Sequence, residues 1–296
     1  MVFEKDYTTI SIARATGRGH CLWLEAIKSV FVVLLLAAIS DTLATFIKNI
    51  LFREPLHESY AMLLYSYELL VSVFLTMAYC RFAEHRQLQS MGITKHVWKS
   101  YGFGALIGLC TFSADILLCS LLRVFRFTGT NHEVNLGIQI LWLGGYLIQG
   151  LSEELLFRGY IFVSAARKNS MISAGILSAA LFSLFHIFND GIGILSLINL
   201  FLFGIFEVVC FLFTDSIWLA AAVHSIWNYA QGCIYGFNVS GISPAESFFF
   251  FEQSDNIILT GGQFGPEGSI ITTVILICVI IIIGLKLHKK DYHTET

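Results

Sequence analysis

SIITTVILICVIIIIGLKL, residues 269–287, decides the fold class of this chain, because it contains a single charged residue, Lys286. A helix needs about 20 mostly apolar residues to cross the hydrocarbon core of a bilayer. Residues 24–47, LEAIKSVFVVLLLAAISDTLATFI, form a second such stretch. Six more candidate spans follow the same criterion: 60–80, 100–122, 136–157, 171–188, 191–213 and 216–236. We therefore predict an all-α polytopic membrane protein with about eight transmembrane helices.

The composition supports this class. Of the 296 residues, 56% are hydrophobic and 13% are charged, whereas soluble domains carry about 25% charged residues. The formal net charge of −3 argues against a nucleic-acid-binding chain, and the seven cysteines form no C-x-x-C pair. The predicted environment is the lipid bilayer, with no nucleic-acid partner and one membrane-embedded domain over residues 1–296.

The distribution of lysine and arginine predicts the orientation. With eight spans both termini lie on one side, and cytoplasmic loops carry the excess of basic residues. The terminal side collects thirteen: Lys5, Arg14, Arg18, Lys28, Arg81, Arg86, Lys95, Lys99, Arg167, Lys168, Lys286, Lys289 and Lys290. The opposite side collects four: Lys48, Arg53, Arg123 and Arg126. We expect both termini in the cytoplasm and the loop 237–268 outside.

The densest group of polar residues lies in the fourth span, QGLSEELLFRGY over residues 149–160. Glu154 and Arg158 are four apart, so on a helix they share a face in the favourable order for an ion pair. Glu153 is turned about 100° away and can point into a helical bundle. Taken alone, this group is also compatible with an ion pair at a helix end.

Two later spans carry histidines. Phe182 and His186 are four apart, and so are His224 and Asn228. A lone histidine in an apolar helix is more often a hydrogen-bonded core residue. Together with Glu153, these side chains could activate a water and stabilise an oxyanion, or bind a divalent metal such as Zn²⁺ with an open position.

These three motifs resemble those of the CPBP family, the CaaX proteases and bacteriocin-processing enzymes also called the Abi family. The segments are Glu153-Glu154-x-x-x-Arg158, Phe182-x-x-x-His186 and His224-x-x-x-Asn228, in the family's order and without a substituted position. The resemblance is close over residues 100–235, which we take as the catalytic core. It implies an intramembrane endopeptidase with a polar cavity that opens toward the cytoplasm.

The resemblance also implies roles for individual residues. Glu153 would be the general base that activates water, with His186 beside it. His224 and Asn228 would hold or polarise the scissile carbonyl and its oxyanion.

Glu154 and Arg158 would tune and position Glu153. Whether the family uses a metal is unsettled; if this chain did, the ligands would be Glu153, His186 and His224. No H-E-x-x-H motif is present, which argues against a soluble-type zinc protease.

The substrate and two other functions stay open. Some family members remove the last three residues of prenylated CaaX proteins, and others act in bacteriocin maturation or immunity, so the substrate would be a peptide or lipidated protein at the membrane. The short loops favour a bacterial plasma-membrane protein. An ion-coupled transporter and a catalytically idle immunity or scaffold protein are the alternatives. Four further acidic residues in apolar spans are interpreted as structural or cavity-lining: Asp41, Glu68, Asp115 and Glu207.

Overall fold

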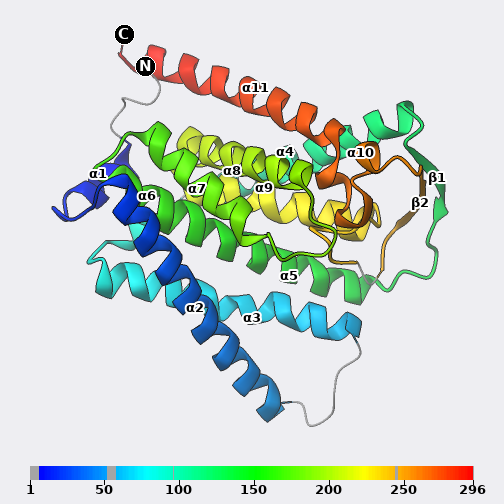
Figure 1. The fold of residues 1–296 in the computed structure, drawn as a ribbon, viewed down its shortest axis with the longest axis horizontal. Coiled ribbons are helices and arrows are strands. Elements are labelled where there is room, and N and C mark those ends of the chain that lie inside the picture. The colour runs from blue at the N-terminus through cyan, green and yellow to red at the C-terminus, as the bar shows by residue number, and fades with distance from the viewer. Residues whose placement is uncertain (1–6, 52–57, 96, 244–245, 296) are drawn as a thin grey trace.

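The computed structural model describes residues 7–51, 58–95, 97–243 and 246–295 and is mostly helical (Figure 1). The α-helices are α1 (Thr8–Arg14), α2 (Leu22–Leu51), α3 (Glu58–Ala78), α4 (Val97–Leu121), α5 (Leu136–Glu154), α6 (Val163–Ala166), α7 (Met171–Phe185), α8 (Ile194–Thr214), α9 (Ile217–Tyr229), α10 (Ile257–Thr260) and α11 (Ile270–Glu295). Three π-helical segments, Tyr79–Ala83, Leu155–Phe162 and Ala230–Ile234, continue α3, α5 and α9. Short 3-10 turns occupy Leu88–Met91, Gly262–Phe264 and Pro266–Gly268.

Five helices within the described residues are long and apolar enough to cross a membrane, which is fewer than the eight spans expected. They are Leu22–Ile50, Leu63–Ala83, Val97–Leu121, Ile194–Thr214 and Ile270–Lys289. Helices also form in the other three predicted regions. However, α7 has 15 residues and α9 has 13, and α5 carries several polar side chains. These three helices carry the motif residues or lead directly into them, so the polar side chains and short helices of the site region account for the difference.

The structure also corrects the expectation of a purely helical chain. Strand β1 (Phe125–Thr130) pairs antiparallel with β2 (Phe249–Gln253). The ring of Phe127 packs edge-on against Phe249 and Phe251, at centroid distances of 5.9 and 5.6 Å. The strands are more than 110 residues apart in sequence, so no local turn signal marks their pairing.

Local capping fixes where the motif helices begin. The side chain of Asn135 accepts hydrogen bonds from the backbone N–H groups of Gly137 and Ile138 at the start of α5. Ser170 and Ser216 cap α7 and α9 in the same way. Such caps satisfy backbone donors that have no partner in the first helical turn, and they set the register of the motif residues.

Helix α9 lies in the middle of the bundle and packs against α4, α5 and α8 (Figure 1). Glycines allow these close approaches. A Cβ added at Gly108 of α4 would lie 2.5 Å from the Val223 carbonyl, and one at Gly150 of α5 would overlap Ser225. Close packing by small residues replaces the hydrophobic driving force that is absent between helices in lipid.

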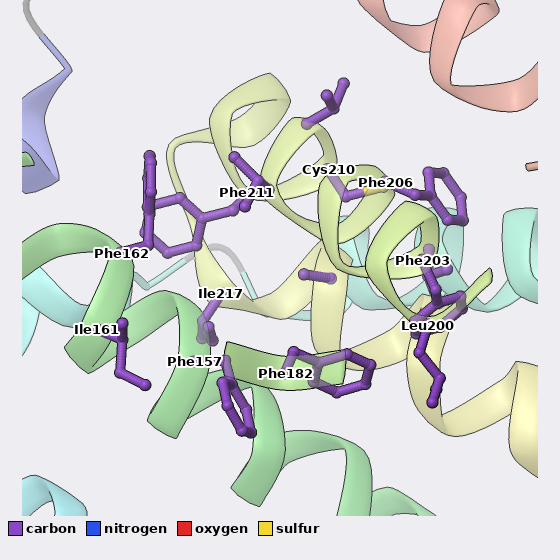
Figure 2. Packing of buried hydrophobic residues seen from close by; sticks show 14 of the residues in the cluster. Phe157, Ile161, Phe162, Phe182, Leu200, Phe203, Phe206, Cys210, Phe211 and Ile217 are labelled. Atoms are coloured by element: carbon purple, nitrogen blue, oxygen red, sulfur yellow. The ribbon is translucent and has the colours of Figure 1, made fainter. Parts of the chain in front are cut away.

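Aromatic side chains fill the space between α7, α8 and the π-helical segment Leu155–Phe162 (Figure 2). Phe157 packs edge-on against Phe182 at 5.1 Å, and Phe162 packs against Phe211 at 5.8 Å. This cluster holds α7 and α8 against the end of α5, where the acidic residues lie.

The two ends of the described chain lie at one end of the bundle. Helix α1 and the last turn of α11 are together at the left in Figure 1, and β1, β2 and α10 are at the opposite end. We call these the terminal end and the strand end. This arrangement fits an even number of passes.

Candidate active site

The two adjacent glutamates point in different directions at the end of α5. Glu154 is fully buried, whereas the side chain of Glu153 keeps 20% of its surface exposed and lines a cavity. Gln149, one turn earlier, donates a hydrogen bond from Nε2 to Oε1 of Glu153 at 3.3 Å. The 100° rotation expected from the sequence therefore separates a cavity-facing carboxylate from a buried one.

Glu154 is the centre of a buried charged network. Its Oε1 accepts a hydrogen bond from Nη1 of Arg158 at 2.9 Å and lies 2.9 Å from Nδ1 of His224. Arg158, also fully buried, donates from Nη2 to the Gly204 carbonyl on α8 at 3.1 Å. The predicted ion pair is confirmed, and it links α5, α8 and α9. Glu154 orients the His224 ring, a contact that the sequence did not predict.

Phe182 connects the arginine to both histidines. The Arg158 guanidinium lies over its ring at 4.8 Å, a cation–π distance. The His186 ring is 4.8 Å from the Phe182 ring and the His224 ring is 5.9 Å from it. His186 caps the C-terminus of α7, and its Nδ1 lies 2.8 Å from the Phe182 carbonyl oxygen. That contact leaves Nε2 of His186 for other partners.

Four of the predicted residues line one cavity of about 390 Å³: Glu153, His186, His224 and Asn228. Nε2 of His224 is 3.9 Å from Oε2 of Glu153, and this oxygen has no hydrogen-bond partner among the described residues. Asn228 is 4% exposed, and none of its described neighbours makes a hydrogen bond to its side chain. A base, two imidazoles and a free amide thus share one polar chamber.

The cavity lies in the half of the bundle nearer the strand end. Its walls come from residues 33–44 of α2, the C-terminal end of α7, the N-terminal parts of α8 and α11, and residues 239–267. The connections at the terminal end contribute none of its described lining. The predicted core over residues 100–235 therefore supplies the motif residues, while α2, α3 and α11 complete the walls.

Several cavity or network residues had no assigned role in the sequence reasoning. Asp41 and Glu68, interpreted as structural or cavity-lining, do line the cavity. Glu207 is fully buried, interacts electrostatically with Glu154 and Arg158, and has no hydrogen-bond partner among the described residues. Placing an ionisable side chain inside an apolar span costs free energy. The presence of Asp41, Glu68 and Glu207 in such spans was the sequence signal that could have indicated a functional role for them.

Glu267 was missed because it lies in an irregular segment that gives no periodic signal. Its Oε2 accepts hydrogen bonds from the backbone N–H and the hydroxyl of Ser240, both at 2.8 Å. Burial raises the pKa of Glu267, and the two hydrogen bonds from Ser240 oppose that effect. Its carboxyl group lines the cavity at the strand end.

Arg86 supports the π-helical segment that carries Arg158. This fully buried guanidinium donates to the carbonyl oxygens of Gly159 at 2.7 Å and Tyr160 at 3.4 Å, and to the Ser164 hydroxyl at 2.9 Å. Burial lowers the pKa of Arg86. Arg86 binds backbone carbonyls of a segment whose hydrogen-bond register departs from that of an α-helix.

The site does not assemble a metal centre. Within the described part of the chain, no three His, Cys, Asp or Glu side chains are grouped so that they could hold a metal ion. Nδ1 of His224 is bound to Glu154, and Nδ1 of His186 is next to the Phe182 carbonyl. These contacts leave Nε2 of both histidines free, as in many metal-bound histidines, but Glu153, His186 and His224 do not form a group that could hold a metal ion, and we derive no step through a metal.

Residues 135–230 match a family model described as type II CAAX prenyl endopeptidase Rce1-like. This region, about a third of the chain, is similar to Rce1-like domains and contains all three motifs. The match confirms the resemblance to the CPBP proteases over these residues. No curated protein matches the sequence.

Proposed function

We propose that this protein is an intramembrane endopeptidase that hydrolyses a peptide bond with a glutamate-activated water. One observation carries the proposal: Glu153, His186, His224 and Asn228 line a single cavity, and Glu154 orients His224 from behind. Each group has the chemistry that one step of amide hydrolysis requires. The similarity to Rce1-like domains supports the same reaction class.

Glu153 is the proposed general base. Its Oε1 is held by Gln149, and its Oε2 is free to accept a proton from a water in the cavity. His186 faces the same space, with Nε2 available to bind that water. The hydroxide would attack the scissile carbonyl carbon, and the protonated Glu153 would then return the proton to the departing amine.

His224 and Asn228 are the proposed oxyanion site. They are one helical turn apart on α9 and both face the cavity. The Asn228 amide donates to the oxyanion, and so does Nε2–H of His224 when the ring is doubly protonated. Glu154 accepts from the other nitrogen, which fixes the ring plane, and the Arg158 ion pair holds Glu154 in place. Preorganised donors of this kind are often the largest contribution to catalysis.

We further propose that the termini are cytoplasmic, and that the protein lies in a bacterial plasma membrane. Thirteen basic residues on the terminal side against four on the other support this orientation. The resemblance implies a cavity that opens toward the cytoplasm, whereas a cytoplasmic terminal end would bring this cavity, which lies toward the strand end, nearer the outer face. We favour the orientation that the distribution of basic residues supports. This orientation places the cavity in the outer half of the bilayer.

The substrate is then a membrane-associated peptide that reaches the cavity from the outer half. We propose that residues 1–296 act as one membrane-embedded domain, with the catalytic core at 100–235. The transporter and the idle immunity or scaffold protein remain the alternative functions, and the following experiment distinguishes them.

The decisive variant is Glu153→Gln, which keeps size and hydrogen bonding but removes the base. Mass spectrometry of membrane proteomes from cells with wild-type protein should find cleaved peptides that are absent with Glu153→Gln. With a purified substrate found in this way, His186→Ala and His224→Ala should also abolish cleavage. Asn228→Ala should retain more activity, since loss of one oxyanion donor costs about 10²–10³ in rate.

Glu133→Gln, a change of the same kind in an exposed loop, is the matched control and should cleave like wild type. Normal turnover by folded Glu153→Gln would refute the mechanism. Proton-coupled uptake without any cleavage product would support the transporter instead.

A further inference from the structure

The cavity walls carry more acidic than basic side chains: the basic residues among the described lining are the two histidines, His186 and His224. Four carboxylates line the cavity: Asp41 on α2, Glu68 on α3, Glu153 on α5, and Glu267 before α11. Within the described residues, no lysine or arginine side chain contributes to the lining. Such a chamber attracts cations and repels anions, and the low polarisability of a bundle interior strengthens both effects.

Asp41 lines this cavity with an exposed side chain. It lies in a long apolar span, where an ionisable residue is costly and normally marks a functional site. No hydrogen bond or ion pair to Asp41 is found among the described residues. Glu68 is paired with Lys48, whose Nζ lies 4.0 Å from Oε1 of Glu68 and whose side chain is 42% exposed. Lys48 lines a groove between α2 and α3 that shares Ala44 and Glu68 with the cavity.

Asp41 and Glu68 belong to the same chamber as the catalytic base. The Tyr65 hydroxyl interacts electrostatically with Glu153, Asp41 and Glu68, and all four side chains line the cavity. The nearly buried and unpartnered amide of Asn228 faces the same space, which indicates that a polar ligand completes this site. A peptide whose scissile bond lies at Glu153 would place a neighbouring side chain near Asp41 and Glu68.

Resting on the proposed peptidase function, we propose that Asp41 and Glu68 bind a lysine or arginine side chain of the substrate close to the scissile bond. A substrate with a free carboxylate three residues beyond that bond, as in a CaaX protein, would bring a negative charge into an acidic chamber. The chain would therefore prefer a cationic peptide to a CaaX C-terminus, although its domain matches a CAAX endopeptidase model.

A peptide library tests this preference. Detergent-purified full-length protein is incubated with peptides randomised at the positions flanking a central amide bond, and products are identified by mass spectrometry. Wild type should enrich lysine or arginine at one subsite over norleucine by about 10- to 100-fold, the range of a charge-assisted contact. The double variant Asp41→Asn, Glu68→Gln should lose this preference, and Asp41→Lys should shift it toward glutamate. Asp255→Asn, in an exposed loop, is the matched control.

A binding measurement separates this proposal from the proposed function. Glu153→Gln protein is photo-crosslinked to benzophenone peptides that differ only in having lysine or norleucine at the selected subsite. If wild type cleaves no peptide, the lysine and norleucine peptides are compared at each flanking position in turn. Crosslinking should favour lysine and should lose that preference with Asp41→Asn.

Absence of cleavage with lysine-selective crosslinking would overturn the peptidase function and keep the cationic site. Cleavage or binding that is indifferent to lysine, or a preference for peptides with a free C-terminal carboxylate, would overturn the cationic site. Proper folding of each variant is checked by its gel-filtration profile. The Asp41→Lys variant remains informative because it should gain a preference for glutamate as well as lose the preference for lysine or arginine.

Discussion

Neutralising the buried pair of Glu154 and Arg158 should reveal strong energetic coupling. Arg158 donates to Glu154 at 2.9 Å, both side chains are fully buried, and Glu207 interacts electrostatically with the same arginine. The perturbation is a double-mutant cycle of Arg158→Gln and Glu154→Gln. Glutamine keeps hydrogen-bonding capacity and approximate length while it removes the charge.

The expected free energies follow from this burial. Removing one partner of a buried ion pair costs about 3–5 kcal/mol, because the other charge stays desolvated and unpaired. Arg158→Gln should lie at the upper end, since it leaves two carboxylates, Glu154 and Glu207, without their cation. The double variant should be no less stable than Arg158→Gln, which implies a coupling energy of at least about 3 kcal/mol, the cost of Glu154→Gln alone.

Buried thiols provide the assay. Unfolding in increasing sodium dodecyl sulfate is followed with a thiol-reactive dye, after replacement of the exposed cysteines Cys21, Cys110 and Cys278 by serine. The four buried cysteines then report on unfolding: Cys80, Cys119, Cys210 and Cys233. The control cycle uses Arg126 and Glu252, an exposed pair between β1 and β2, which should show no measurable coupling.

Additive losses in the Glu154 and Arg158 cycle would refute the reasoning, because they would mean that the two side chains do not stabilise each other. Equal coupling in the buried and exposed cycles would refute the role of burial. Peptide cleavage should also fall with Glu154→Gln alone, since His224 loses its charged acceptor.

Three further predictions concern orientation, metal dependence and pH. In a cysteine-free background, an impermeant thiol reagent should label a cysteine at Ser254 in intact cells but not one at Thr294; the reverse pattern would contradict the cytoplasmic termini. Exhaustive chelation should leave peptide cleavage unchanged, because the described residues do not assemble a metal site, and loss of activity that Zn²⁺ restores would show the opposite. Burial alone would raise the pKa of Glu84, but Arg167 and then Lys28 outweigh it and hold the pKa below its usual value. The ionised Glu84 side chain therefore stabilises the fold above the unfolded-state pKa of about 4.3, and this stabilisation is lost as pH falls through the folded-state pKa. On acidification, Tm should fall more for wild type than for Glu84→Gln. Parallel plots of Tm against pH for the two proteins would contradict this prediction.

The membrane class and the motif geometry within single helices could be predicted from the sequence. Helical periodicity is local, so four-residue spacing was enough to predict the Glu154–Arg158 pair and the shared face of His224 and Asn228. Apolar stretches likewise indicated where helices form. The count of eight spans was less secure, because α5, α7 and α9 combine polar residues with short helices, and mean hydropathy cannot distinguish a polar span from a buried segment.

Contacts between distant segments needed the tertiary structure. The pairing of β1 with β2, the contact of Glu154 with His224, and the position of Glu267 in the cavity all join residues far apart in the chain. No local pattern specifies which helix faces meet, because in a membrane bundle the choice depends on close packing at positions such as Gly108 and Gly150. The sequence by itself determined a helical membrane protein with a glutamate–histidine motif set. Only the tertiary structure decided that the cavity lies toward the strand end and has acidic walls, because both properties depend on how separate helices pack together.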